Sequence, residues 1–215
     1  MKQEQFEALR KVGNVKFSDG LIIARPVAGG RSEASVKNHG PSSGIYMYRY
    51  SFKLDGEFTD GRAIVLQFHD WWNLETNMFS KKRGPYYMAT PPPIAFVAGG
   101  GRLLLETNSI GTYKFDIDNK YFVPDSNQHE KHLLDNDLDQ FRLGEWTDLD
   151  IEIKWSRKDD GYVECNGTRI ENMPTMFNTL SHNIQFGLYH SLDAGFTSNT
   201  IREFSFSRKG KGTND

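Results

Sequence analysis

Polar side chains stand at alternate positions in three short segments of this chain that are otherwise largely apolar. An extended backbone directs alternate side chains to opposite faces, so each segment would show one polar pair on one face of a strand. The pairs are Arg31 and Glu33, Gln67 and His69, and Gln185 and Tyr189. In the first pair, an ionised carboxylate can hold a guanidinium in a fixed orientation. Together the pairs offer a cation, two amides, an imidazole and a phenol for hydrogen bonding to a polar ligand.

These pairs need strands to position them, and much of the chain predicts strands. Residues 148–155 alternate between acidic or basic and apolar side chains, which is typical of a strand with one wet face. Residues 45–54 place aromatic side chains on one side, which we expect to be core. Further strands are expected at residues 20–25, 31–36, 63–70, 94–97, 102–107, 112–117, 183–190 and 200–208.

The turns and the composition indicate an all-β fold. Asp160-Gly161 and Asn166-Gly167 are typical of tight hairpins and predict a meander after residue 155. Helix is expected only as a short piece in residues 3–12 and as fragments of a loop over residues 125–143. Aromatic residues make up 13% of the chain and there are 20 glycines, which favours pleated sheets joined by turns. We expect one domain over residues 1–215, a sandwich or jelly roll of two antiparallel sheets with a concave groove.

Charge and cysteine content exclude several classes of protein. The 26 basic and 28 acidic residues give a formal charge of −2, which offers no electrostatic case for nucleic acid or an anionic membrane. No apolar run approaches the roughly 18 residues of a membrane span. The single cysteine, Cys165, excludes an internal disulfide framework and favours a small, unreactive strand residue.

The three segments resemble a known family. Arg31-Ser32-Glu33, Gln67-Phe68-His69 and Phe186-Gly187-Leu188-Tyr189 resemble, in order and rough spacing, the signature strands of alginate-lyase-like polysaccharide lyases, written R-S/T-E, Q-x-H and K-A-G-x-Y. The segments between them are closer to the heparin-lyase and glucuronan-lyase branch of that jelly-roll clan. They are residues 92–96 (PPIAF), 144–148 (GEWTD), 153–156 (IKWS) and 160–163 (DGYV).

The resemblance implies β-elimination on a uronate-containing polysaccharide, with a 4,5-unsaturated uronate as product. Removal of the C5 proton requires that the neighbouring carboxylate be neutralised, a role implied for Gln67 and Arg31. Tyr189 would protonate the departing O4. His69 would be the base on guluronate or iduronate, whereas Tyr189 would serve both steps on mannuronate or glucuronate. The sequence leaves both routes open.

The resemblance also implies that residues around the catalytic set bind an anionic polysaccharide. The expected binding residues are Glu33, Gln185, Lys81, Lys82, Arg83 and Tyr86. Two positions depart from the family pattern, because Gln185 stands where many relatives have lysine and Ser191 where the alginate branch has glutamine.

Alternatives to a lyase remain open at this point. A non-catalytic carbohydrate-binding jelly roll, or one assembled on a phage, virion or cell surface, would use the same groove for adhesion. A glycoside hydrolase is disfavoured, because no closely spaced acidic pair appears near Gln67. Residues 135, 137 and 139 resemble a calcium loop, yet Gln140 replaces the glycine of an EF-hand, so no metal or other cofactor is expected and calcium stays an open alternative. The chain shows no signal peptide, and we expect an extracellular or virion-associated location over a cytoplasmic one.

Overall fold

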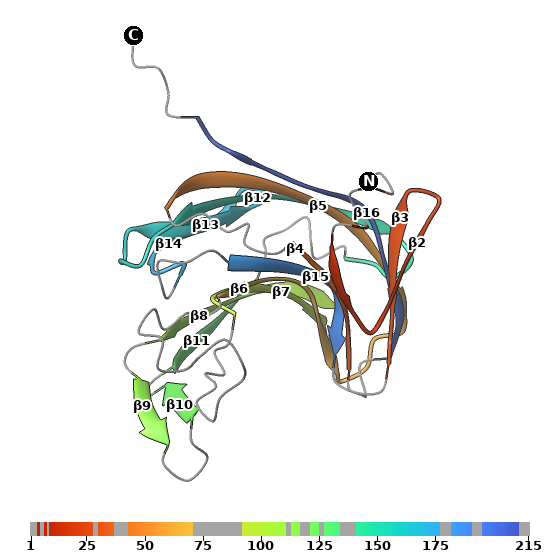
Figure 1. Cartoon of the computed structure of the whole chain (residues 1–215), viewed down its shortest axis with the longest axis horizontal. Coiled ribbons are helices and arrows are strands. Elements are labelled where there is room, and N and C mark those ends of the chain that lie inside the picture. Colours follow the sequence, from red (N-terminus) through yellow and green to blue (C-terminus); the bar gives the residue numbers. More distant parts are fainter. Residues whose placement is uncertain are drawn as a thin grey trace.

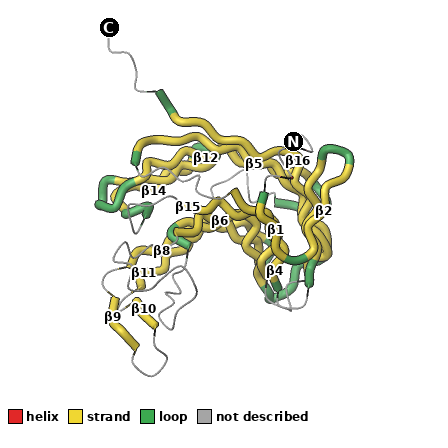
Figure 2. The backbone as a smooth tube through the Cα atoms, in the orientation of Figure 1, coloured by secondary structure: helices red, strands yellow, loops and turns green. Residues whose placement is uncertain are grey.

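The computed structural model describes residues 4, 7, 9–27, 30–36, 43–70, 92–110, 113–116, 121–124, 127–133, 141–176, 182–190 and 195–210. These residues form two large antiparallel sheets that lie one over the other, with a small hairpin beside them (Figures 1 and 2). The all-β jelly-roll prediction is confirmed.

The first sheet is the lower one in Figure 1, and it arches so that its concave side faces away from the second sheet. In spatial order its strands are β1 (Arg10–Val12), β4 (Arg31–Val36), β15 (His182–His190), β6 (Arg62–Asp70), β7 (Ile94–Gly99), β8 (Arg102–Ile110) and β11 (Asn127–Leu133). The three segments that carry the polar pairs are therefore adjacent strands, although they lie far apart in the sequence.

The second sheet covers the convex side of the first. In spatial order its strands are β14 (Thr168–Met173), β13 (Gly161–Cys165), β12 (Trp146–Trp155), β5 (Gly44–Gly56), β16 (Phe196–Arg208), β3 (Leu21–Arg25) and β2 (Asn14–Ser18). A separate two-stranded sheet pairs β9 (Tyr113–Asp116) with β10 (Tyr121–Pro124).

Aromatic side chains fill the space between the two sheets. Tyr48 of β5 meets Phe68 of β6 edge to face with ring centroids 4.9 Å apart, and Phe186 of β15 stacks on Phe204 of β16 at 4.7 Å. Such pairs add to the large apolar area that each ring buries. The prediction that residues 45–54 turn their aromatic side to the core is confirmed.

The meander predicted after residue 155 is also confirmed, since β12, β13 and β14 pair in sequence order. Asn166 and Gly167 form the turn between β13 and β14 with φ angles of 48° and 87°. Both angles are in the left-handed region that Asn-Gly pairs tolerate.

Two local predictions need correction. Residues 127–133, expected within a loop with helical pieces, form β11, because their backbone pairs with β8 along its length. In residues 3–12, Glu4 and Glu7 are helical but Arg10–Val12 form strand β1 beside β4.

Candidate active site

The three polar pairs meet on the concave face of the first sheet. Antiparallel pairing puts Gln185 of β15 opposite Gln67 of β6 on one side, and Tyr189 opposite Arg31 of β4 on the other. The residues between them, such as Phe186, point to the core. The alternation seen in the sequence is thus the alternation between core and groove.

One carboxylate joins the pairs of two strands. Glu33 accepts hydrogen bonds from Arg31 Nε and, at 2.7 Å, from Gln67 Nε2. The Arg31 Nη2 atom donates to the Gln185 Oε1 atom at 2.8 Å. The guanidinium is therefore held by a carboxylate and an amide, a charge-assisted arrangement that fixes its orientation.

The members of this cluster differ in their exposure to solvent. The Glu33 side chain is 3% exposed and Gln67 is 1% exposed, whereas the Arg31 side chain is 36% exposed. The expectation that Glu33 and Gln185 touch a substrate stays a prediction, because their contacts here are with Arg31 and Gln67. Arg31 is the accessible charge of the cluster.

Burial also raises the pKa of Glu33, against the opposing effects of the Arg31 charge and the hydrogen bonds from Gln67 and Arg31. The unpaired carboxylate would be costly to keep ionised in such a place, so its charge depends on the arginine. The charges of Glu33 and Arg31 are therefore coupled.

Tyr189 lies beside this cluster at the surface. Its side chain is 42% exposed, and the Arg31 guanidinium carbon lies 5.3 Å from the centre of its ring. A cation at this distance is attracted by the aromatic face. The phenol and the accessible cation therefore share one part of the groove.

His69 stands at the opposite end of the cluster. It is partly buried and lies across from Asn183, whereas Tyr189 lies across from Ile64. The two levels are five positions apart on β6, or roughly 16 Å of backbone at about 3.3 Å per residue. Arg31 is in contact with the Tyr189 ring, whereas the backbones of His69 and Tyr189 lie at different levels of the sheet.

A second arginine–glutamate pair lies on the same face and was not predicted from the sequence. Arg62 of β6 donates to the Glu106 carboxylate of β8, with side chains 44% and 5% exposed. Arg62 lines a depression of about 270 Å³ with Ile64, Tyr189 and His190. It repeats the first pair, an accessible arginine anchored on a buried glutamate.

A β-bulge explains why the sequence pattern did not predict Arg62 in the groove. Counting in twos back from Gln67 would put Val65 and Ala63 in the groove and Arg62 in the core. Instead Val65 has no counterpart on β7, so the alternation shifts there, and both Val65 and Ala63 are buried in the core. The signal available in the sequence was the improbable core position of an arginine.

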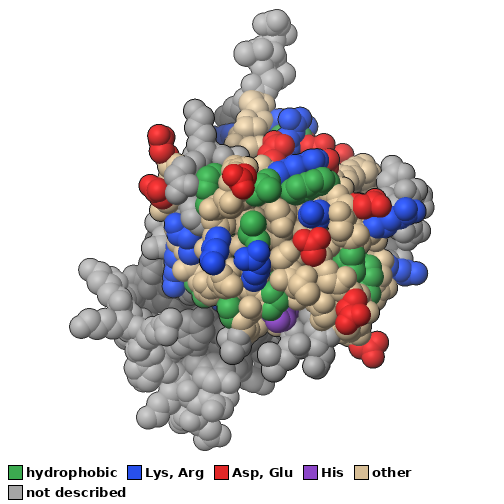
Figure 3. Space-filling view, turned by 90° about the vertical axis from the view of Figure 1, so that its right-hand side faces the viewer, with side chains coloured by type: hydrophobic (Ala, Val, Ile, Leu, Met, Phe, Trp, Pro, Cys, Tyr) green, Lys and Arg blue, Asp and Glu red, His purple; other side chains and the backbone are tan. Residues whose placement is uncertain are grey.

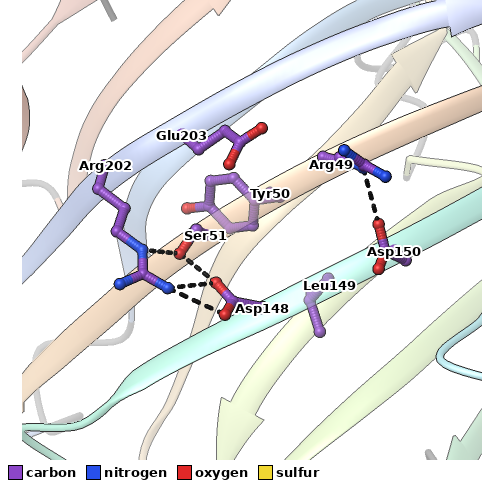
Figure 4. Close-up of a pocket in the computed structure, with 8 residues that line it drawn as sticks. All are labelled: Arg49, Tyr50, Ser51, Asp148, Leu149, Asp150, Arg202 and Glu203. Atoms are coloured by element: carbon purple, nitrogen blue, oxygen red, sulfur yellow. Dashed lines mark hydrogen bonds and ion pairs between the residues drawn. The ribbon is translucent and has the colours of Figure 1, made fainter.

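A second depression, of about 320 Å³, lies on the outer face of the other sheet (Figure 4). Arg202 forms two hydrogen bonds with Asp148, at 2.8 and 2.9 Å, and Arg49 pairs with Asp150. Arg49 therefore lies on the outer face of the second sheet, away from the groove. Basic and acidic side chains are also interspersed on the described part of the side shown in Figure 3, so no large patch of one sign covers it.

The remaining predicted residues belong to segments that the structure does not describe. Lys81, Lys82, Arg83 and Tyr86 lie outside the described residues, as do Ser191 and the acidic residues of the calcium alternative. Among the residues that are described, no three His, Cys, Asp or Glu side chains group as metal ligands would. That same part of the chain also holds no helix with the length and apolar character of a membrane span.

Comparison with known proteins places this geometry in context. The sequence profile of a family described as polysaccharide lyase matches residues 7–206. No curated protein matches the chain.

Solved structures share the fold at low identity. An endo-β-1,4-glucuronan lyase from the fungus Trichoderma reesei superposes with a TM-score of 0.62 at 15% identity, covering 94% of this chain and 87% of that one. The alginate lyase A1-II′, of polysaccharide lyase family 7, gives 0.55 at 17% identity and covers 88% and 79%. The alginate lyase PA1167 from Pseudomonas aeruginosa gives 0.54 at 14% identity and covers 91% and 86%.

Proposed function

Because the chain belongs to the polysaccharide lyase family, we propose that it cleaves a uronate-containing polysaccharide by β-elimination in the groove of the first sheet. The observation that carries this proposal is the accessible Arg31 guanidinium, fixed by Glu33 and Gln185 beside the exposed ring of Tyr189. The similar structures are named for the uronate polymers glucuronan and alginate, which supports a uronate substrate.

The reaction asks three things of the groove. The C5–H bond breaks and its electron pair forms the C4–C5 double bond as the C4–O4 bond breaks, and O4 takes up a proton. Charge develops on the uronate carboxylate during this step, and a fixed cation stabilises that charge more in the transition state than in the ground state. Arg31 supplies the cation, and Tyr189 supplies the proton to O4.

The geometry favours Tyr189 for the proton abstraction as well. Its ring lies beside Arg31, whereas the His69 backbone lies roughly 16 Å along the sheet from the level of Tyr189, at about 3.3 Å per residue. In this route the deprotonated Tyr189 oxygen takes the C5 proton and then gives that same proton to O4. A single group can serve both steps where the C5 proton and O4 lie on the same face of the sugar, as in glucuronate and mannuronate. We therefore propose one of these as the cleaved residue, with His69 assisting through the substrate carboxylate.

The other groove residues extend this proposal. Gln67 is the amide beside His69, and its contact with a sugar requires a rearrangement that exposes it, because it is 1% exposed here. Arg62 would bind the carboxylate of a neighbouring sugar. We retain Lys81, Lys82, Arg83 and Tyr86 as proposed binding residues, with no cofactor and an extracellular or virion-associated location.

The test is an assay on glucuronan, alginate, hyaluronan-like and heparin-like polymers, followed by the ultraviolet absorbance of the conjugated C4–C5 double bond. We expect cleavage of a glucuronate or mannuronate polymer, abolished by Tyr189→Phe and reduced by His69→Ala. Tyr162→Phe is the matched control, because Tyr162 bonds to Glu152 in the other sheet.

Two outcomes would contradict the proposal. Binding of a polymer with no absorbance change would indicate a carbohydrate-binding or surface-assembly protein. New reducing ends without the double bond would indicate hydrolysis.

A further inference from the structure

Two bulges lie next to each other beneath the groove. Against β15, β6 offers only Val65 opposite the two residues Gly187 and Leu188, and against β7 the same Val65 has no counterpart. A bulge interrupts the ladder and turns part of the backbone away from its neighbour. On β15, Tyr189 follows directly after this point, and on β6 Arg62 lies three residues before Val65.

The carbonyl oxygens at these bulges receive donors from the opposite sheet. The Tyr50 hydroxyl of β5 donates to the Val65 oxygen at 2.9 Å. The Asn199 Nδ2 atom of β16 donates to the Gly187 oxygen and, at 3.2 Å, to the Tyr50 hydroxyl. A short polar chain therefore crosses the aromatic core and ends on both bulges. Tyr50 itself is labelled in Figure 4.

This chain is buried and incompletely satisfied. Tyr50 and Asn199 are 1% and 0% exposed, and the Asn199 Oδ1 atom has no hydrogen-bond partner. A buried amide oxygen without a partner destabilises the fold, so an asparagine at this position is a poor choice for stability alone. Burial raises the pKa of Tyr50, which keeps its hydroxyl protonated as a donor.

The alternation of side chains between core and groove shows what the hydrogen bonds from Tyr50 and Asn199 achieve. The bulge at Val65 is what directs Arg62 and Ile64 into the groove instead of the core. If the bulge were lost, the side chains beyond it would exchange faces. The contact between Arg31 and Tyr189 would loosen with it, because Tyr189 pairs with Ile64 across this point.

We propose that Tyr50 and Asn199 are positioning residues, which fix the two bulges from the far side of the core and so hold Tyr189 and Arg62 in the groove. They touch no substrate. The inference rests on the proposed function for its effect on catalysis, and on the structure alone for its effect on the bulges.

The experiment compares Tyr50→Phe with Tyr48→Phe. Both tyrosines are on β5 and 1% exposed, and each variant removes one buried hydroxyl, but the Tyr48 hydroxyl accepts a hydrogen bond from Trp155 Nε1 at 2.9 Å instead of reaching a bulge. Asn199→Ala is a second test variant that removes the donor to Gly187. The measurements are kcat and KM on the cleaved polymer, and hydrogen exchange of the backbone amides of residues 184–189.

We expect Tyr50→Phe to lower kcat by about tenfold or more, since small displacements of reacting groups are costly. It should change KM less and speed exchange at Gly187 and Tyr189. Tyr48→Phe should keep kcat within about twofold and leave that exchange unchanged.

Equal kcat in the two folded variants, or unchanged exchange in both Tyr50→Phe and Asn199→Ala, would overturn the inference. If the wild type cleaves none of the polymers, the proposed function fails, and the exchange measurement still decides whether Tyr50 and Asn199 hold the bulges.

Discussion

At the scale of single residues, the groove uses one device twice. An arginine that is about two-fifths exposed is anchored on a glutamate that is almost fully buried, in Arg31–Glu33 and again in Arg62–Glu106. Surface ion pairs contribute little to stability, and a carboxylate buried this deeply is costly. The arrangement is better explained by the need for two oriented cations than by stability.

We predict that Arg62→Gln raises KM for the cleaved polymer by about tenfold and changes kcat less, because a lost charge-assisted contact outside the reacting sugar weakens ground state and transition state alike. Arg49→Gln is the control, since Arg49 also pairs with a carboxylate but lies on the outer face of the other sheet. Steady-state kinetics of both variants provide the check. An unchanged KM in Arg62→Gln would remove Arg62 from the binding site.

At the scale of elements, the geometry of β15 depends on a glycine. Gly187 has a φ of 142°, and a Cβ there would overlap the carbonyl oxygen of Ser32 on β4. No residue with a side chain tolerates both this backbone conformation and the close approach of the neighbouring strand. The motif that carries Tyr189 is therefore fixed by backbone packing as well as by hydrogen bonds.

Gly187→Ala should destabilise the protein by more than about 3 kcal/mol, because backbone strain and overlap add. Gly167→Ala is the matched control, as its φ of 87° is also positive but nothing lies within 4 Å of the added Cβ. We expect the control to cost about 1 kcal/mol. Urea unfolding of the two variants measures the difference, and equal losses would show that the contact with β4 relaxes freely.

The outer face of β12 should contribute to the pH dependence of stability. A hydrogen bond from Ser51 lowers the pKa of Asp148 from its ordinary 3.8. Burial opposes this effect, and the hydrogen bonds and charge of Arg202 lower the pKa further. A lowered pKa means that the stabilisation is present above the unfolded pKa and is lost as the pH falls through the folded one. Asp148→Asn should therefore be less stable than wild type near neutral pH.

The gap between Asp148→Asn and wild type should close as the pH falls from about 7 to about 3. Urea unfolding across this range tests the prediction. Asp150→Asn, the next outward carboxylate on β12, is the control, with a smaller change expected because Arg49 reaches it through one hydrogen bond. A gap that stays constant with pH would contradict the assignment.

At the scale of the whole molecule, the core formed by both sheets encloses the single thiol. Cys165 is buried on β13, and burial raises its pKa to about 12. Because the thiolate is the reactive form, the native protein should resist thiol reagents. Labelling should require separation of the sheets.

We predict that Cys165 labels only through global unfolding, so its labelling in increasing urea should follow the same free energy as loss of the tryptophan fluorescence signal. Thiol labelling at several urea concentrations provides the measurement. Rapid stoichiometric labelling of the native protein would show a local opening of β13.

The sequence pattern predicted the large sheets and the face of the polar pairs, because period-2 alternation reports burial directly. It missed β11, whose polar residues form a strand through pairing with β8. It missed Arg62 because a bulge changes the phase of β6, and it missed Asn199 because the use of a buried amide depends on the opposite sheet. Local periodicity in the sequence does not report contacts between strands that are distant in the chain.

The strands of the groove also separate positions that support the fold from positions that can vary. Alternate positions of β4, β6 and β15 pack against the second sheet, whereas exposed positions between them, such as Tyr189 and Arg62, do not. Substrate preference could therefore be altered by a library restricted to the accessible alternate sites, with little expected loss of folding. The polar residues sealed among them, such as Glu33 and Gln67, would have to be redesigned together or left alone.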